Sequence, residues 1–235
     1  MKILAFETSA KSVSVAAVED GTVLASASLC TGLTHSRTLA PMMDALLRNA
    51  ELPLSSIDVF AVAAGPGSFT GIRIGVAAVK GLAWAQEKPC AAVSTLYAMA
   101  VGAPCGEAEL ICAMDARRNQ IYSARFLREN GELLRLSSDC AIGLDELTDT
   151  LQKEPPRRRV VVGDGAPLCA VWLQEHGISC SLAPPPLSPQ NAVGVALAAE
   201  EMARRGELCT AQTLRPVYLR ASQAERERAE REAMQ

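Results

Sequence analysis

The order of secondary-structure patterns in the first half of the chain recurs in the second half. Apolar periodicity predicts three strands, a helix, a buried strand and a long helix, in the first half at 3–6, 12–16, 22–29, 39–47, 59–64 and 72–85. The second half repeats this order at 110–114, 120–127, 132–136, 144–151, 160–162 and 167–176. Such a duplication predicts an α/β fold with two lobes, each with a mixed sheet and flanking helices.

The remaining segments divide between these lobes. A short strand at 90–94 and a helix from 95 close the first half, and a helix at 191–205 is expected to complete the second. We therefore predict an N-terminal lobe at 1–104, a C-terminal lobe at 105–220 and a charged tail at 221–235. The acidic residues Glu7 and Asp115 each follow the first strand of their half.

A glycine-rich turn, GPGSFTGIRIG, joins the buried strand at 59–64 to the long helix. Glycines at a helix N-terminus free backbone N–H groups to bind anions. The spacing is nevertheless one residue off the dinucleotide fingerprint, and a P-loop needs Gly-Lys followed by Ser or Thr where this helix has Gly-Ile-Arg. The alternative interpretation is a turn that lets strand and helix pack closely. The candidate phosphate or nucleotide region comprises Glu7, Thr8, Ser9, Gly65, Gly67, Ser68, Arg73 and Asp115.

The long helix carries only two charges between residues 71 and 85, Arg73 and Lys80. A helix that is apolar almost all round must be covered on more than one side. Its own sheet supplies one cover. The second is either another protein or a part of this chain, for which Leu33, Trp84 and the C-terminal segment are the candidates.

Composition excludes several classes of function. A net charge of −3 gives no basic surface for gripping nucleic acid unaided. The eight cysteines form no CxxC pair and only two histidines are present, so we expect reduced thiols and no bound metal. No apolar run reaches the roughly 18 residues of a membrane helix, and the N-terminus lacks a signal-peptide pattern. We expect a cytoplasmic protein that does not enter a membrane.

Strands and helices in this twofold order, with an acid after each first strand, are typical of the actin, Hsp70 and sugar-kinase superfamily. A closer resemblance is carried by ILAFETS, HSRTLAPMMDALL, GPGSFTGIRIG, AMDARRNQIY and PVYLR. These segments, spread over nearly all of residues 1–220, resemble the bacterial TsaB family. The chain differs from that family in having Glu7 where aspartate is usual, and its tail at 221–235 matches nothing we can assign.

The resemblance implies a non-catalytic subunit needed to place threonylcarbamoyl on the adenosine beside the anticodon of tRNA. It implies a TsaD-like catalytic partner, a TsaE-like ATPase in the larger complex, and contact with tRNA only through that complex. No cofactor is expected to bind this chain stably. If ATP binds, it is expected in the complex or at the interface between this chain and its partner. A homodimer could form alone through the surface that binds the partner.

TsaB-like and TsaD-like lobes pair through the two helices of the N-terminal lobe, so the resemblance places the partner surface there. Methionine supplies adaptable contacts, and small residues allow close approach of a partner helix. The predicted interface comprises Leu39, Met42, Met43, Leu46, Gly71, Ile72, Gly75, Val76, Val79 and Leu82. The opposing interpretation is that these residues fill the space between the helices and their own sheet.

Two enzymatic functions are the alternatives to the partner function. A phosphotransferase or ATPase would use the cleft between the lobes, with Glu7 and Asp115 polarising a metal-bound phosphate; the same carboxylates could instead cap backbone groups at strand ends. A metalloprotease would need HxxxH or HExxH, but Leu39 stands at the fourth position after His35. We interpret His35 as a polar residue at a helix start. We interpret the arginine run at 157–159 as a solvated loop.

Overall fold

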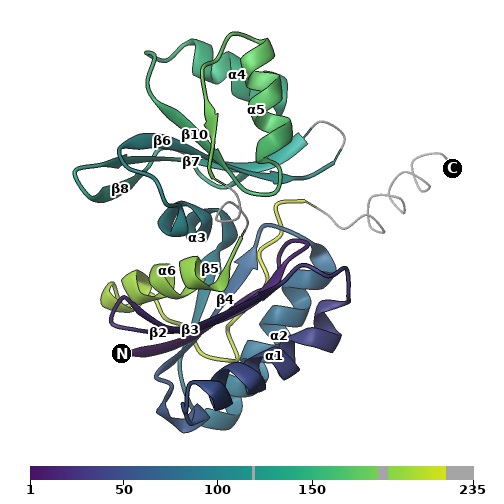
Figure 1. The fold of residues 1–235 in the computed structure, drawn as a ribbon, viewed down its shortest axis with the longest axis vertical. Coiled ribbons are helices and arrows are strands. Elements are labelled where there is room, and N and C mark those ends of the chain that lie inside the picture. The colour runs from purple at the N-terminus through teal and green to yellow at the C-terminus, as the bar shows by residue number, and fades with distance from the viewer. Residues whose placement is uncertain (118–119, 185–189, 221–235) are drawn as a thin grey trace, which may run out of the picture.

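The computed structural model describes residues 1–117, 120–184 and 190–220. It has two lobes, one above the other in Figure 1, each built on one β-sheet. The tail at 221–235 lies outside the described residues. Among the described helices, none is long and apolar enough to cross a bilayer.

The N-terminal lobe contains a five-stranded sheet in the order β3-β2-β1-β4-β5. Its strands are β1 (Lys2–Glu7), β2 (Val13–Glu19), β3 (Thr22–Leu29), β4 (Val59–Gly65) and β5 (Cys90–Ser94). Its helices are α1 (His35–Asn49), α2 (Phe69–Gln86) and α3 (Thr95–Gly102), with a short 3₁₀ turn at Leu54–Ser56. The first three strands are antiparallel, whereas β4 and β5 continue the sheet in parallel with β1.

Side-chain alternation gives this sheet two apolar faces. Leu4 and Phe6 of β1 join a cluster with α1 and α2, while Ile3 and Ala5 join a second cluster on the opposite face. Every residue of β4 is buried, which confirms the prediction of a strand covered on both sides. A sheet with two apolar faces requires a helical cover on each.

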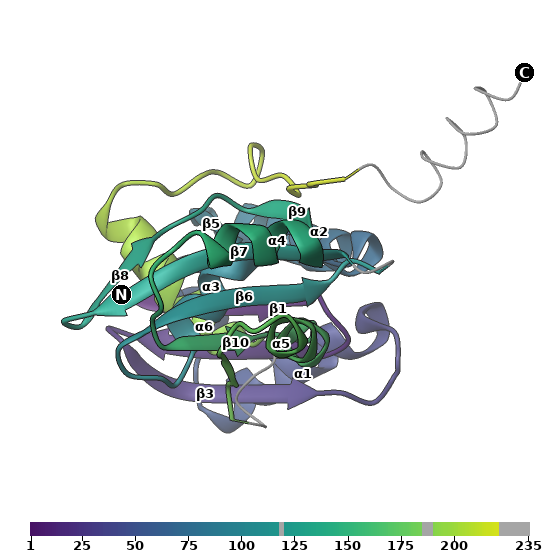
Figure 2. The same ribbon diagram turned by 90° about the horizontal axis from the view of Figure 1, so that it is seen from above.

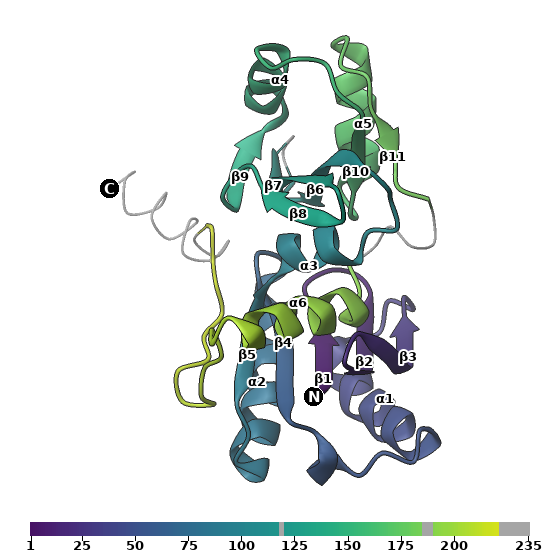
Figure 3. The same ribbon diagram turned by 90° about the vertical axis from the view of Figure 1, so that its left-hand side faces the viewer.

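The second cover is α6 (Ala192–Arg204), and here the sequence-based assignment was wrong. This helix packs on β1, β2, β4 and β5 of the N-terminal sheet instead of completing the C-terminal lobe, as Figure 3 shows. The physical reason is the uncovered face of β1 and β4, which small residues of α6 fill. A close contact between Gly102 of α3 and Gly194 of α6 lets those two helices approach each other.

The C-terminal lobe has a six-stranded sheet in the order β11-β10-β6-β7-β8, with β9 paired to β7. Its elements are β6 (Ala108–Asp115), β7 (Gln120–Glu129), β8 (Glu132–Arg135), β9 (Cys140–Gly143), α4 (Leu144–Gln152), β10 (Arg159–Val162), α5 (Ala166–Glu175) and β11 (Ser181–Leu182). Helices α4 and α5 lie on the outer face of the sheet (Figure 2). Helix α3 packs on the inner face and so joins the lobes. The short strands β9 and β11 were not predicted, because β11 has only two residues and the CAIG sequence of β9 has no polar residue to alternate with apolar ones.

A buried ion-pair network crosses the C-terminal sheet. Glu109 is fully buried and accepts from Arg125 Nε at 2.6 Å and from Arg159 Nε at 3.1 Å. The interpretation of the run at 157–159 as a solvated loop is therefore wrong for Arg159, which is the first residue of β10 and is buried. A buried carboxylate needs paired cations to offset its lost hydration.

Residues 207–220, hereafter the C-terminal segment, run from α6 along β5 and α2 (Figure 3). Leu214 is 1% exposed and joins the cluster under α2, and Lys80 Nζ donates to the Leu214 carbonyl at 3.2 Å. The N–H of Val217 donates to the carbonyl of Ala64 at 2.7 Å. Trp84, by contrast, is 65% exposed. The C-terminal segment thus supplies the second cover that α2 requires.

Candidate functional site

The first half of the candidate site is the bend after β1. Glu7 is 1% exposed, and its Oε1 accepts the N–H of Ser9 at 2.5 Å, while Oε2 has no partner. Burial raises the pKa of Glu7 to about 7, and the negative charge of Asp164 adds to this rise. Burial therefore favours the neutral form of this carboxyl group.

The glycine turn is pressed against the same bend. A Cβ added at Gly71 would lie 2.1 Å from the Thr8 carbonyl oxygen, and one at Gly75 would lie 2.4 Å from Thr8 Oγ1. Thr8 Oγ1 in turn donates to the Gly71 carbonyl at 2.8 Å. Gly71 and Gly75, predicted to let a partner helix approach, instead make room for the chain's own first bend.

Two backbone donors at the start of α2 are likewise engaged within the chain. The N–H of Ser68 donates to the Ser9 carbonyl at 2.7 Å, and Ser68 Oγ accepts the N–H of Gly71 at 3.2 Å. A Cβ added at Gly67 would lie 2.5 Å from the same Ser9 carbonyl oxygen. These groups fill part of the space and use two of the donors that a phosphate at this helix terminus would need.

Arg73, the basic residue of the predicted phosphate region, contacts the C-terminal segment. Arg73 donates from Nε to Tyr218 Oη at 2.8 Å, and its guanidinium lies 3.8 Å from the centre of the Phe69 ring. Phe69 and Tyr218 stack with their ring centres 4.6 Å apart. Gly65 packs on the Val217 carbonyl of the same C-terminal segment. Both residues therefore hold the C-terminal segment.

The second half of the site repeats the arrangement of the first. Asp115 at the end of β6 accepts from the N–H of Arg117 at 2.7 Å, as Glu7 accepts from a residue two positions on. Gly165 after β10 donates its N–H to the Ala113 carbonyl at 3.1 Å. A Cβ added there would lie 2.7 Å from the Asp115 nitrogen. The two acids thus cap equivalent backbone turns, although Glu7 is buried and Asp115 is exposed.

Two functional candidates that the sequence analysis missed lie between these halves. Burial raises the pKa of Asp164, whose Oδ1 accepts from Gln190 Nε2 at 2.9 Å. Its charge acts on Glu7, and the charge of Asp115 acts on Asp164. The signal was available, because Asp164 stands inside the Gly163-Asp164-Gly165 turn that matches Gly65-Pro66-Gly67.

The geometry fits a nucleotide or a metal-bound phosphate poorly. A Mg²⁺-holding carboxylate must be ionised, whereas burial favours the neutral form of Glu7. Among the described residues, no group of three or more His, Cys, Asp or Glu side chains is placed to hold a metal ion. His35 stands at the start of α1 and its Nε2 lies 2.8 Å from the Ala10 carbonyl oxygen.

The predicted partner residues fall into two groups. Met43 and Leu82 are partly exposed. The other eight are buried in the N-terminal lobe, namely Leu39, Met42, Leu46, Gly71, Ile72, Gly75, Val76 and Val79. They turn inward because α1 and α2 direct their most apolar faces toward the sheet. These eight residues therefore fill the space between the helices and their own sheet.

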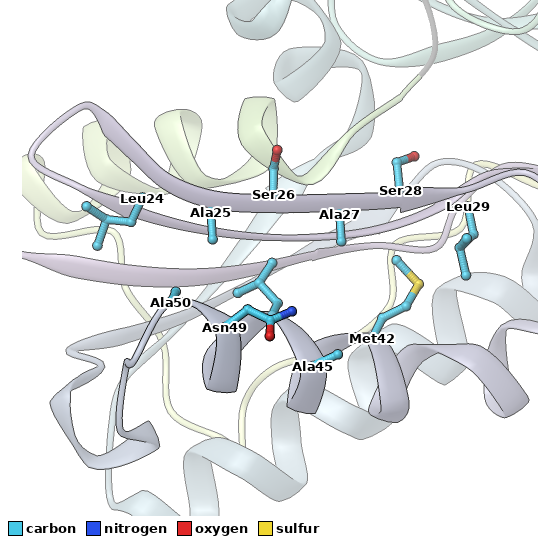
Figure 4. Close-up of a pocket in the computed structure, with 11 residues that line it drawn as sticks. Leu24, Ala25, Ser26, Ala27, Ser28, Leu29, Met42, Ala45, Asn49 and Ala50 are labelled. Carbon is cyan, nitrogen blue, oxygen red and sulfur yellow. The ribbon is translucent and has the colours of Figure 1, made fainter.

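Two of the buried residues still border an open groove. Met42 and Leu46 line a groove of about 330 Å³ between α1 and the edge strand β3. Figure 4 shows Ala25, Ala27 and Leu29 of β3 pointing toward α1. The groove is lined by apolar and uncharged side chains and offers no ion pair to a ligand.

A different face of α2 remains available to a partner. Ile74, Ala78 and Leu82 recur every four residues and so share one side of the helix, where all three are partly exposed. Arg73 and Lys80, which contact the C-terminal segment, lie on another side. We refer to Met43, Ile74, Ala78 and Leu82 as the α1–α2 surface.

Duplicated lobes, each with a carboxylate at the end of its first strand, define a two-lobed protein of the actin-like α/β class. The model of the family described as "TsaD: tRNA N6-adenosine threonylcarbamoyltransferase" matches residues 30–227. The chain is 35% identical to the TsaB protein of Escherichia coli K12 over 167 residues, which cover 70% of this chain and 72% of that one. It is 32% identical to the TsaB protein of Bacillus subtilis over 66% and 67% of the two chains.

A solved structure of similar fold supports the same family. A Pseudomonas aeruginosa protein described as similar to peptidase YeaZ superposes with a TM-score of 0.79 at 29% identity, covering 93% of this chain and 99% of that one. The chain therefore belongs to the TsaB family and has a role in the biosynthesis of threonylcarbamoyladenosine in tRNA.

Proposed function

We propose that this chain is a non-catalytic subunit that binds a TsaD-related catalytic subunit and keeps it active. The observation that carries the proposal is the filled site at the start of α2. The Ser9 carbonyl accepts the Ser68 N–H, and Thr8 occupies the space beside Gly71 and Gly75. Because backbone groups that could bind a phosphate instead bond within the chain, we infer that the protein acts in its pathway by binding a partner.

The α1–α2 surface is proposed as the docking site. The match to the TsaD family model supports a partner of related fold, and partly exposed apolar side chains on adjacent helices suit helix-to-helix packing. A second copy of this chain would compete for the same surface. The TsaE-like ATPase and tRNA are proposed to join only in the complex, and any ATP is proposed to bind at the shared surface. Such a complex would act on tRNA in the cytoplasm.

The proposal is tested by co-elution of this chain with the TsaD-related subunit, using Ala78→Glu as the disrupting variant. A carboxylate buried without a partner in an interface costs several kcal/mol, so we expect binding to weaken at least tenfold. Val171→Glu, on an exposed residue of α5 in the other lobe, is the matched control and should bind normally. Unchanged binding by a folded Ala78→Glu protein would refute the proposed surface.

A further inference from the structure

Cys90 and Cys209 face each other across an antiparallel backbone pair. The N–H of Cys90 donates to the Cys209 carbonyl at 2.7 Å, and the N–H of Cys209 donates to the Cys90 carbonyl at 2.8 Å. Residues that exchange both hydrogen bonds in this way have Cα atoms about 5.5 Å apart. Disulfides span Cα distances of about 4.4–6.8 Å, which this pair meets. They also need Cβ atoms about 3.5–4.5 Å apart, closer than the roughly 5 Å of directly opposed residues, so the link requires a small local shift of the C-terminal segment toward β5.

The two side chains also share a face. Directly opposed residues in an antiparallel pair project to the same side of the sheet, and both cysteines pack against the cluster beneath α2. Both are free thiols, Cys90 fully buried and Cys209 partly exposed. One member of the pair is thus accessible to a small oxidant while the other is held next to it.

We propose that Cys90 and Cys209 form a redox-sensitive site, in which a peroxide joins them as a disulfide that fastens the C-terminal segment to β5. Nothing in the proposed partner function requires this bond. The disulfide would fix the start of the C-terminal segment covalently at Cys209. Farther along, the segment is already held by hydrogen bonds from Val217 to Ala64 and from Arg73 to Tyr218.

The chemistry proceeds in two balanced steps. The Cys209 thiolate attacks one oxygen of hydrogen peroxide, breaks the O–O bond and becomes a sulfenic acid. The hydroxide that leaves takes up the proton lost by the Cys209 thiol and becomes one water. The Cys90 thiolate then attacks the sulfenic sulfur, forms the S–S bond and breaks the S–O bond. The hydroxide expelled takes up the proton lost by the Cys90 thiol and becomes a second water. Two thiols are thereby oxidised by two electrons and the peroxide is reduced to two waters.

The local charges influence the rate of this reaction. Burial raises the pKa of Cys90 to about 11 and also raises the pKa of Cys209, which disfavours the thiolate. The ammonium group of Lys80 opposes this rise at both sulfurs. We therefore expect oxidation that is slower than at an activated cysteine and that speeds up as pH rises.

The test is peptide mapping of the full chain after exposure to hydrogen peroxide. We expect a cross-linked peptide pair containing Cys90 and Cys209, reversed by dithiothreitol, in most molecules. Hydrogen exchange over residues 207–220 should slow at least severalfold in the oxidised protein, because the segment can no longer lift from β5. Cys209→Ser should abolish the cross-link and the added protection, whereas Cys140→Ser in the C-terminal lobe should retain both.

Two results would overturn the proposal. One is peroxide-treated protein in which Cys209 is oxidised to a sulfinic acid or linked to another cysteine while Cys90 remains a thiol. The other is a Cys90–Cys209 cross-link that leaves exchange over 207–220 unchanged. Because Cys90 is fully buried and its replacement could disturb folding, Cys209→Ser is the decisive variant.

Discussion

Replacing Glu7 with glutamine is expected to remove a pH dependence from the stability of the protein. The pKa of Glu7 is raised by burial, with a smaller contribution from Asp164, so the folded state holds this proton more tightly than the unfolded state. The stabilisation is fully present below the unfolded pKa and is lost as pH rises through the folded pKa. Glutamine copies the neutral form and keeps an acceptor for the Ser9 N–H.

The magnitude follows from the size of the shift. A rise in pKa from 4.5 to about 7 corresponds to roughly 3 kcal/mol, at about 1.4 kcal/mol per unit. Glu7→Gln and the parent should therefore have similar unfolding free energies below about pH 4, and the variant should be more stable by roughly 3 kcal/mol near pH 8. Urea unfolding followed by fluorescence of Trp84 and Trp172 measures both proteins at each pH.

The difference between variant and parent reports the titration of Glu7 together with its coupling to Asp164, which is present in both proteins. Glu175→Gln makes the same chemical change at an exposed residue of α5, and its unfolding free energy should match the parent throughout. If the difference between Glu7→Gln and the parent does not change with pH, Glu7 is ionised in the fold. The description of a closed, filled first bend would then be wrong.

Three further predictions concern the packing of the N-terminal lobe, each measured by urea unfolding. Gly75→Ala should destabilise the protein by more than about 1 kcal/mol, because the new Cβ would meet Thr8 Oγ1 at 2.4 Å. Gly81→Ala, where nothing lies near the new Cβ, should stabilise it by about 0.5–1 kcal/mol, and equal effects of the two changes would contradict the close packing at Gly75. Val79→Glu should cost at least about 3 kcal/mol, since Val79 is fully buried, and a stable variant would mean that this residue faces outward. Leu214→Ala should cost about 2–5 kcal/mol, and a negligible cost would mean that the C-terminal segment does not contribute to the core.

The elements and their order could be predicted because their patterns are local. The strand predicted at 59–64 is β4 (Val59–Gly65), and the helix predicted at 72–85 is the core of α2. The helix begins earlier than predicted, at Phe69, because Ser68 caps it by accepting the Gly71 N–H. Capping depends on side-chain placement that apolar periodicity does not report.

Which surface each element covers could not be predicted, because that depends on contacts between distant residues. The pattern of α6 shows an apolar face but does not say which sheet receives it, and the uncovered face of β1 decided the outcome. The same limit applies to the predicted partner residues. Val76 and Val79 are apolar whether they face a partner or a sheet, and only the fold distinguishes the two.

The candidate site was partly foreseen. Glu7 and Asp115 were placed at equivalent strand ends and both cap backbone turns, one of the two roles weighed for them. The influence of the Asp164 charge on Glu7 was missed because the two residues are far apart in sequence and come near each other only in the fold. A buried carboxyl group is recognised by its surroundings, which sequence spacing does not contain.

The central claim is that this chain supports threonylcarbamoyl transfer without catalysing it, and a reconstituted tRNA modification assay tests it directly. The rate is measured with the TsaD-related subunit alone, with this chain alone, and with both, using the parent, Glu7→Gln and Asp115→Ala. We predict product only when both proteins are present, and rates within about tenfold of the parent for both variants, since loss of a catalytic group costs roughly 10²-fold or more. Product from this chain alone, or a loss of several orders of magnitude in a folded variant that still binds its partner, would contradict the claim.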